Sequence, residues 1–148
     1  MIQRERNLEH ERASYAFKCV EDIKNQNNEK AESKYRTAAL SAGTLIHKSG
    51  LLQALAFYIS KKDYHSIAKD MLFWLTEIPV NNSDVKASLK VMYKQLLSLN
   101  DEDIIYKTQE TRALIVWLKR FSEAMLKDKD KKDEEPKKDE LKTEQKSD

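Results

Sequence analysis

Apolar side chains recur at intervals of three and four residues along most of this chain, which is the period of an α-helix. The pattern predicts helices over about residues 3–25, 29–48, 51–59, 63–76, 84–99 and 101–126. Glycine and proline occur only twice each, which is too few for the turns that a sheet protein needs. We therefore predict an all-α fold, a compact bundle of five or six helices in one domain over residues 1–126.

Polar residues and one glycine mark the ends of these predicted helices. Gly50 follows a basic last turn and should end the second helix by adopting the left-handed conformation. Ser83 or Asp84 should cap the fifth helix, and Asn100 or Asp101 the sixth, because these side chains accept hydrogen bonds from free backbone N–H groups.

The helical period also predicts which side chains are buried. Cys19 should be a small buried hydrophobe, and the last helix presents a strong apolar stripe through Trp117. Phe73 and Trp74 belong to a run of large apolar residues too wide for one stripe, so one of the two should face a loop or another protein. Other positions expected to face inward include Phe17, Val20, Ile23, Tyr35, Ala39, Met71, Leu89, Met92, Leu96, Leu97, Leu114, Leu118 and Phe121.

The composition changes sharply at residue 127. Residues 127–148 contain eight Lys, nine Asp or Glu, and Leu141 as their one bulky apolar residue. Such a segment cannot bury enough apolar surface to offset its ordering entropy, so we predict a disordered tail. Its mixed charge signs argue against a dedicated nucleic-acid arm.

Several classes of protein are not indicated by the sequence. Cys19 is the only cysteine, so no intrachain disulfide forms. The chain lacks both an apolar run long enough to span a membrane and the apolar core of a signal peptide, which predicts a cytoplasmic protein. Nucleotide-binding glycine motifs and zinc-ligand spacings are missing, and the three histidines lie on different predicted helices. We therefore expect no cofactor, no metal site and no small-molecule substrate.

The formal net charge is +2, which excludes a strongly basic nucleic-acid binder but leaves room for a local patch. Phosphate contacts are electrostatic and need only a few cations on one face. Charged residues on a helix usually form a face that is simply solvated. Periodicity alone does not decide between such a face and a phosphate-binding patch. Cations expected at helix ends and on outer faces, and so candidates for a phosphate-binding patch, include Lys18, Lys48, Lys61, Lys62, Lys119 and Arg120.

One pair of residues resembles a catalytic motif. Arg4 is followed after five residues by His10, a spacing similar to that of small helical ribonucleases of the HEPN type. Glu5 departs from the polar amide or imidazole that often follows the arginine in that family. A ribonuclease is therefore the less favoured alternative.

Three strings of residues go beyond generic helix patterns. They are ERASYA at 11–16, LIHKSGLLQALAF at 45–57 and ETRALIVWLKRFSEA at 110–124. Together they resemble the small helical subunit of the Cmr complex, the RNA-targeting type III-B CRISPR effector. The resemblance extends over about residues 3–126, and the tail lies outside it.

The resemblance implies a non-catalytic protein that acts in antiviral defence as part of a ribonucleoprotein. Members of that family stack in several copies beside the backbone subunits and help to hold the duplex of guide RNA and target RNA through its phosphates. The implied partners are thus other copies of this chain, the backbone subunits and both RNAs. Of the candidate cations, Lys48, Lys119 and Arg120 lie within the matching strings. A helical protein–protein scaffold that does not touch RNA is the other alternative.

Overall fold

The computed structural model describes residues 2–128, with side chains from residue 7 onward. The described residues form helices and connecting turns, without a strand, which confirms the predicted all-α bundle. A 3₁₀ turn, η1 (Lys62–Tyr64), precedes the fourth α-helix. The six α-helices are α1 (Ile2–Lys24), α2 (Glu29–Ser49), α3 (Leu51–Ser60), α4 (His65–Thr76), α5 (Val85–Leu97) and α6 (Asp101–Met125).

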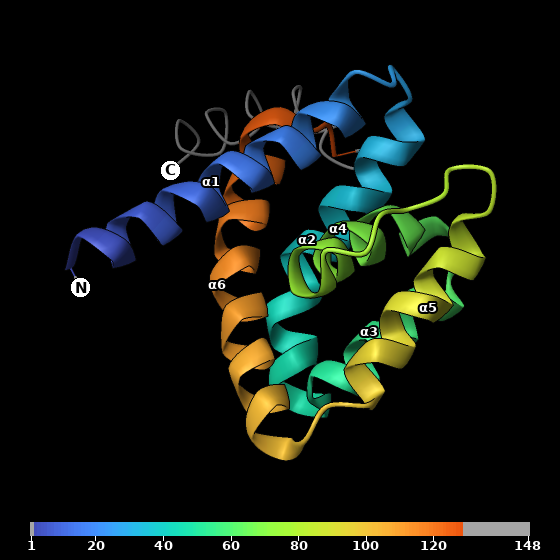
Figure 1. Ribbon diagram of the computed structural model, residues 1–148. Helices are drawn as coiled ribbons and strands as arrows, with labels where there is room; N and C mark the ends of the chain where they lie inside the picture. The colour runs from blue at the N-terminus through green and yellow to red at the C-terminus, as the bar shows by residue number, and fades with distance from the viewer. Residues whose placement is uncertain (1, 129–148) are drawn as a thin grey trace, which may run out of the picture.

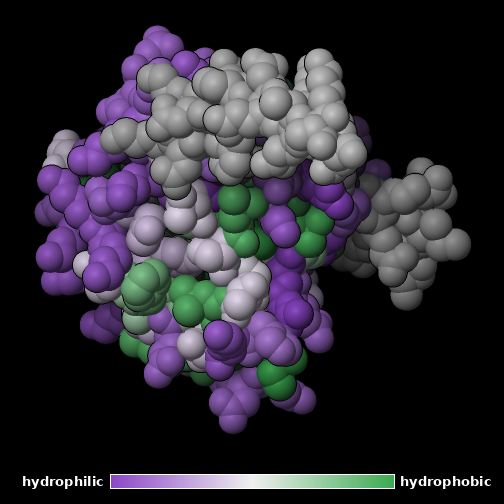
Figure 2. All heavy atoms as spheres, turned by 180° about the vertical axis from the view of Figure 1, so that it is seen from behind, coloured by the Kyte–Doolittle hydropathy of each residue, from purple (hydrophilic) through white to green (hydrophobic). Residues whose placement is uncertain are grey.

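The long helix α6 runs along one side of the molecule and packs against α1, α2 and α4 (Figure 1). Helix α1 crosses it and packs against it, and α2 packs along it in the opposite direction. Helices α3 and α4 follow beside α2, and α5 covers α4 at the far side from α1. Seen from behind, hydrophilic side chains cover most of the molecule and hydrophobic ones gather in small groups (Figure 2). None of the helices described is long and apolar enough to cross a membrane.

The predicted cap residues define the observed helix ends. The Asp84 side chain accepts from the N–H of Ala87, and Asn100 accepts from the N–H of Asp103 at 2.8 Å. Gly50 joins α2 to α3 with φ 84° and ψ 163°. Its φ is positive, as predicted, but its ψ lies outside the left-handed helical region, in a conformation that essentially only glycine adopts.

Most of the predicted core is buried, including Cys19, but some predicted positions are wrong. Leu97 is 56% exposed because it lies on the outer face of α5, three residues after the exposed Lys94, while its neighbour Leu96 faces the core. Phe17 is 43% exposed at the edge of the contact between α1 and α6. Trp117 and Phe121 are only partly buried, since they pack at that same edge.

A carboxylate at the junction of three helices explains which residue of the Phe73–Trp74 pair turns inward. Glu110 on α6 accepts two hydrogen bonds from Arg12 on α1, at 2.7 and 2.8 Å, and a third from the indole of Trp74 on α4 at 2.9 Å. The ring of Trp74 also packs against Tyr15. Trp74 is therefore not the free apolar surface that a scaffold would use, and Phe73 is the exposed member of the pair.

A second polar cluster lies inside the core where α1, α2 and α4 meet. The side-chain carboxylate of Asp70 on α4 accepts a 2.7 Å hydrogen bond from the hydroxyl of Tyr35 on α2. The backbone carbonyl of Asp70 accepts another from the hydroxyl of Tyr15 on α1. Burial raises the pKa of Asp70 to about 6, although the Tyr35 hydrogen bond opposes the shift. Burial, with the nearby Asp70 carboxylate, also raises the pKa of the Cys19 thiol.

The end of α6 is joined to the start of α2. Leu126 is buried, the backbone N–H of Lys127 donates to Glu32 at 2.9 Å, and Arg36 pairs with Asp128 at 3.0 Å. Thus the first two residues of the segment predicted as a tail contact α2. The rest of that predicted tail, residues 129–148, lies outside the described residues.

Candidate nucleic-acid interface

The six cations predicted to bind RNA are all exposed side chains. Within residues 7–128, some basic residues have carboxylate partners: Arg12 pairs with Glu110, Lys34 with Asp63, and Arg36 with Asp128. The six candidates form no such ion pair with a described residue. Their charge is therefore available to a partner.

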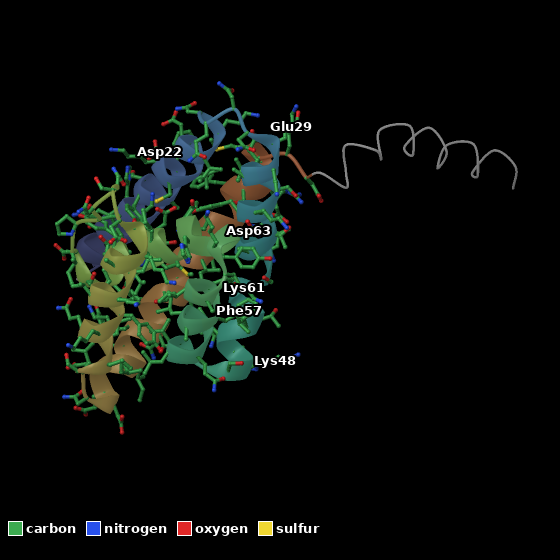
Figure 3. The ribbon with its side chains drawn as sticks, turned by 90° about the vertical axis from the view of Figure 1, so that its right-hand side faces the viewer. Asp22, Glu29, Lys48, Phe57, Lys61 and Asp63 are labelled. Carbon is green, nitrogen blue, oxygen red and sulfur yellow. The ribbon has the colours of Figure 1, made fainter. Side chains whose placement is uncertain are left out.

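Three of these cations lie at the ends of α2 and α3. Lys48 is in the last turn of α2, and Lys61 and Lys62 follow α3 directly. Lys48 and Lys61 lie along one side of the molecule with Phe57 between them (Figure 3). The ammonium of Lys61 stands 5.8 Å from the centre of the Phe57 ring, a cation–π contact.

The other three cations are placed elsewhere. Lys119 and Arg120 are on the outer face of α6, close to the end at which α6 meets α1. Lys18 is on the outer face of α1, where Glu21 and Asp22 are its neighbours one turn along the helix. The structure therefore does not bring the six residues together into one patch, and Lys18 has acidic surroundings.

A more regular group of cations, which was not predicted from the sequence, lies on α5. Lys86, Lys90 and Lys94 are spaced four residues apart, so they share one face of the helix, and all three are exposed. Helix α5 contains no acidic residue. The four-residue spacing without an intervening acid was the signal that could have identified this stripe.

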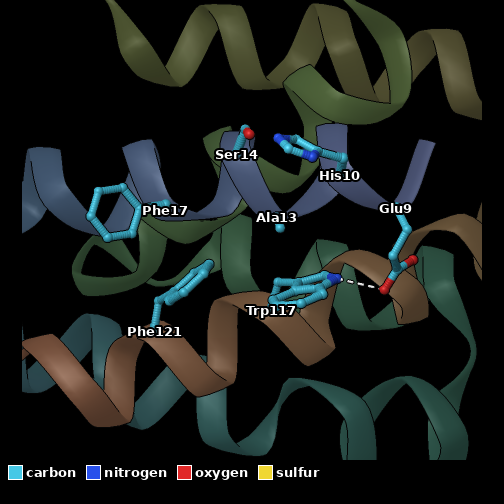
Figure 4. A pocket seen from close by; sticks show the side chains of 7 residues that line it. All are labelled: Glu9, His10, Ala13, Ser14, Phe17, Trp117 and Phe121. Carbon is cyan, nitrogen blue, oxygen red and sulfur yellow. Dashed lines mark hydrogen bonds between the residues drawn. The ribbon is translucent and has the colours of Figure 1, made fainter. Parts of the chain in front are cut away.

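An open aromatic groove of about 560 Å³ lies at the edge of the contact between α1 and α6. The ring of Phe17 on α1 meets that of Phe121 on α6 edge to face, with 5.3 Å between the ring centres. The ring of Trp117 stacks beside Phe121, with 5.8 Å between the ring centres (Figure 4). The indole of Trp117 donates to Glu9 at 2.8 Å. Its partly exposed rings make the groove a surface of the kind that protein interfaces use.

The groups that could do chemistry are dispersed. His10 lines the aromatic groove, His47 is exposed at the end of α2, and the Nε2 of His65 lies 2.7 Å from the carbonyl of Ile59. Among the residues that the structure describes, no three His, Cys, Asp or Glu side chains are grouped to hold a metal ion. Burial raises the pKa of both Asp70 and Cys19, and both side chains lie in the core, away from the exposed surface.

Comparison with known proteins decides the family. The family model described as "CRISPR-associated protein (Cas_Cmr5)" matches residues 8–125, which include all three of the strings quoted above. The chain belongs to the Cas_Cmr5 family. This result confirms the resemblance inferred from the sequence, and membership makes the chain a subunit of a Cmr CRISPR effector complex.

A solved structure shows the same fold. It is the X-ray crystal structure of a CRISPR-associated Cmr5 family protein from Thermus thermophilus, with a TM-score of 0.64 and 23% sequence identity. The match covers 81% of this chain and 98% of the Thermus chain. At this identity the likeness supports the Cmr5 helical architecture, while the roles of individual side chains must be argued from this structure.

Proposed function

We propose that this Cmr5-family chain is a non-catalytic, cytoplasmic subunit that helps to hold the guide RNA–target RNA duplex through its phosphates. The observation that carries the proposal is the set of exposed cations without carboxylate partners among the described residues, foremost Lys48, Lys119 and Arg120. Lysine and arginine bind phosphate through charge, and such contacts do not depend on base sequence.

The small net charge fits a supporting role in a larger complex. A chain of net charge +2 is a poor stand-alone binder, since affinity for a phosphate backbone grows with the number of cations that meet it. Inside a ribonucleoprotein, the larger subunits supply most of the grip, and a few cations per small subunit are sufficient. Several copies along the duplex would multiply their effect.

The aromatic groove between α1 and α6 supports the second part of the proposal, contact with neighbouring protein subunits. Phe17, Trp117 and Phe121 offer partly exposed rings, and aromatic side chains are enriched in protein interfaces. We propose that the neighbours are other copies of this chain and the backbone subunits. A scaffold that uses such contacts alone, without touching RNA, is the competing function.

Charge reversal in the assembled complex separates the two functions. Lys48→Glu/Lys119→Glu/Arg120→Glu should leave the subunit in the complex but lower the affinity for target RNA, with the largest difference from wild type at low salt, where charge contacts contribute most. The matched control is Lys48→Arg/Lys119→Arg, which keeps the charges. Normal retention across a salt series would favour the scaffold.

The ribonuclease alternative has a direct test. Purified full-length protein incubated with labelled RNA should leave the RNA intact, and His10→Ala should change nothing. The side chain of Arg4, the other member of the resembling pair, lies outside the described side chains. Cleavage that disappears in His10→Ala would overturn the non-catalytic proposal.

A further inference from the structure

A small pocket lies where the turn after α3 meets the start of α5. Its volume is about 240 Å³, and it is lined by Lys62, His65, Ser66, Lys69 and Val85. Within the described residues, Lys62 and Lys69 form no ion pair. Asp63, which follows Lys62, is paired instead with Lys34 on α2 at 3.7 Å. The pocket therefore combines two available ammonium groups with the hydroxyl of Ser66.

The histidine at this pocket is held in one orientation. Its Nε2 lies 2.7 Å from the carbonyl oxygen of Ile59, and a carbonyl only accepts, so Nε2 carries the hydrogen. The second ring nitrogen, Nδ1, remains for another partner.

The pocket adjoins the lysine stripe of α5. Val85 forms one wall of the pocket and is the first residue of α5, and Lys86 comes directly after it. Lys86, Lys90 and Lys94 then continue along the outer face over about 12 Å, at 1.5 Å per residue. Their ammonium groups have no carboxylate partner among the described residues.

We infer that the pocket and the α5 stripe form one surface that binds consecutive phosphates of an RNA strand. The inference rests on the proposed role in RNA retention. It assigns that role to a surface that contains only one of the six cations predicted from the sequence, Lys62. A length of about 12 Å corresponds to roughly three to four phosphates of one strand along a duplex axis. Lysine is depleted and aromatic residues are enriched in protein–protein interfaces, so the composition of this surface favours RNA over an acidic protein.

The test uses Cmr complexes reconstituted with the full chain and loaded with guide and labelled target RNA. Lys86→Glu/Lys90→Glu/Lys94→Glu should keep its normal stoichiometry in the complex and release target RNA at least ten-fold faster at moderate salt. The dependence of log affinity on log salt should become shallower by about two, because up to three phosphate contacts are lost. Lys86→Arg/Lys90→Arg/Lys94→Arg is the matched control and should retain RNA normally. Circular dichroism checks that the variant is folded. We expect no change, because the three lysines are exposed and do not pack in the core.

The outcomes separate this inference from the proposed function. The triple variant Lys48→Glu/Lys119→Glu/Arg120→Glu changes the net charge by the same amount elsewhere on the molecule. RNA loss for that variant alone would overturn the α5 surface and keep the proposed function. Normal RNA retention for both variants would overturn the α5 surface and the proposed function alike. If the α5 variant instead failed to enter the complex, with or without RNA, the surface would bind a protein, and the inference would be wrong.

Discussion

Asp70 offers the sharpest test of the packing described for α1, α2 and α4. Its carboxylate is buried in the core, and burial raises its pKa from 3.8 to about 6. Each unit of pKa difference between the folded and unfolded states is about 1.4 kcal/mol. The difference of about two units therefore makes the ionised side chain cost about 3 kcal/mol of folding free energy at neutral pH.

The sign follows from the raised pKa. Below pH 3.8 the carboxyl is neutral in both states and costs nothing; as pH rises through 6 the folded protein must bury the charge, so stability is lost over that window. Asp70→Asn removes the charge but keeps an oxygen that accepts the Tyr35 hydroxyl. We expect the variant to match the wild type at pH 4 and to exceed it by up to about 3 kcal/mol at pH 7.5.

Urea denaturation of both proteins from pH 4 to pH 8 measures this difference. Glu21→Gln is the matched control, because it removes an exposed carboxylate from α1 and should change stability by less than about 0.5 kcal/mol at any pH. The reasoning would be refuted if Asp70→Asn lowered stability by the same amount at every pH. That result would mean that the hydrogen-bond geometry, not the buried charge, dominates at this position.

Three further predictions concern the helix contacts and the single thiol. Glu110→Gln should destabilise the fold by about 2–3 kcal/mol at pH 7, because Arg12 and Trp74 lose a charged acceptor; Arg12 lowers the pKa of Glu110, so the deficit measured by thermal denaturation should shrink as pH falls below 4.5. Leu118→Ala should cost about 2–5 kcal/mol in urea denaturation, and the partly buried Trp117→Ala should cost less; the reverse order would contradict the edge position of Trp117. Cys19 should resist a thiol reagent at pH 8 until the protein is unfolded, because burial raises its pKa, and fast labelling of the native protein would show that the core is open there.

The helices and their ends were predictable because their causes are local. Asp84 and Asn100 cap with their own side chains, and Gly50 supplies a positive φ that other residues avoid. The family was also predictable, since long strings of residues carry it. Both kinds of signal lie within short stretches of sequence.

The errors concern how the helices cross one another. Phe17 and Trp117 have the spacing of core residues, but α1 and α6 meet at an angle that leaves both rings at the edge of the contact. Glu110 could not be recognised as a junction, because its partners Arg12 and Trp74 come from distant segments. For the same reason, the sequence did not show that Lys62 lies close to the start of α5.

Site-specific crosslinking tests the central claim, RNA contact by this subunit, most directly. Because Cys19 is buried, a cysteine introduced at Lys90 or Lys119 can carry a photoactivatable group alone, and Glu11→Cys, at an exposed position of α1, serves as the control. In assembled complexes carrying guide and target RNA, we predict RNA crosslinks from positions 90 and 119 and none from position 11. If positions 90 and 119 both formed crosslinks to protein and neither formed one to RNA, RNA contact by this subunit would be contradicted.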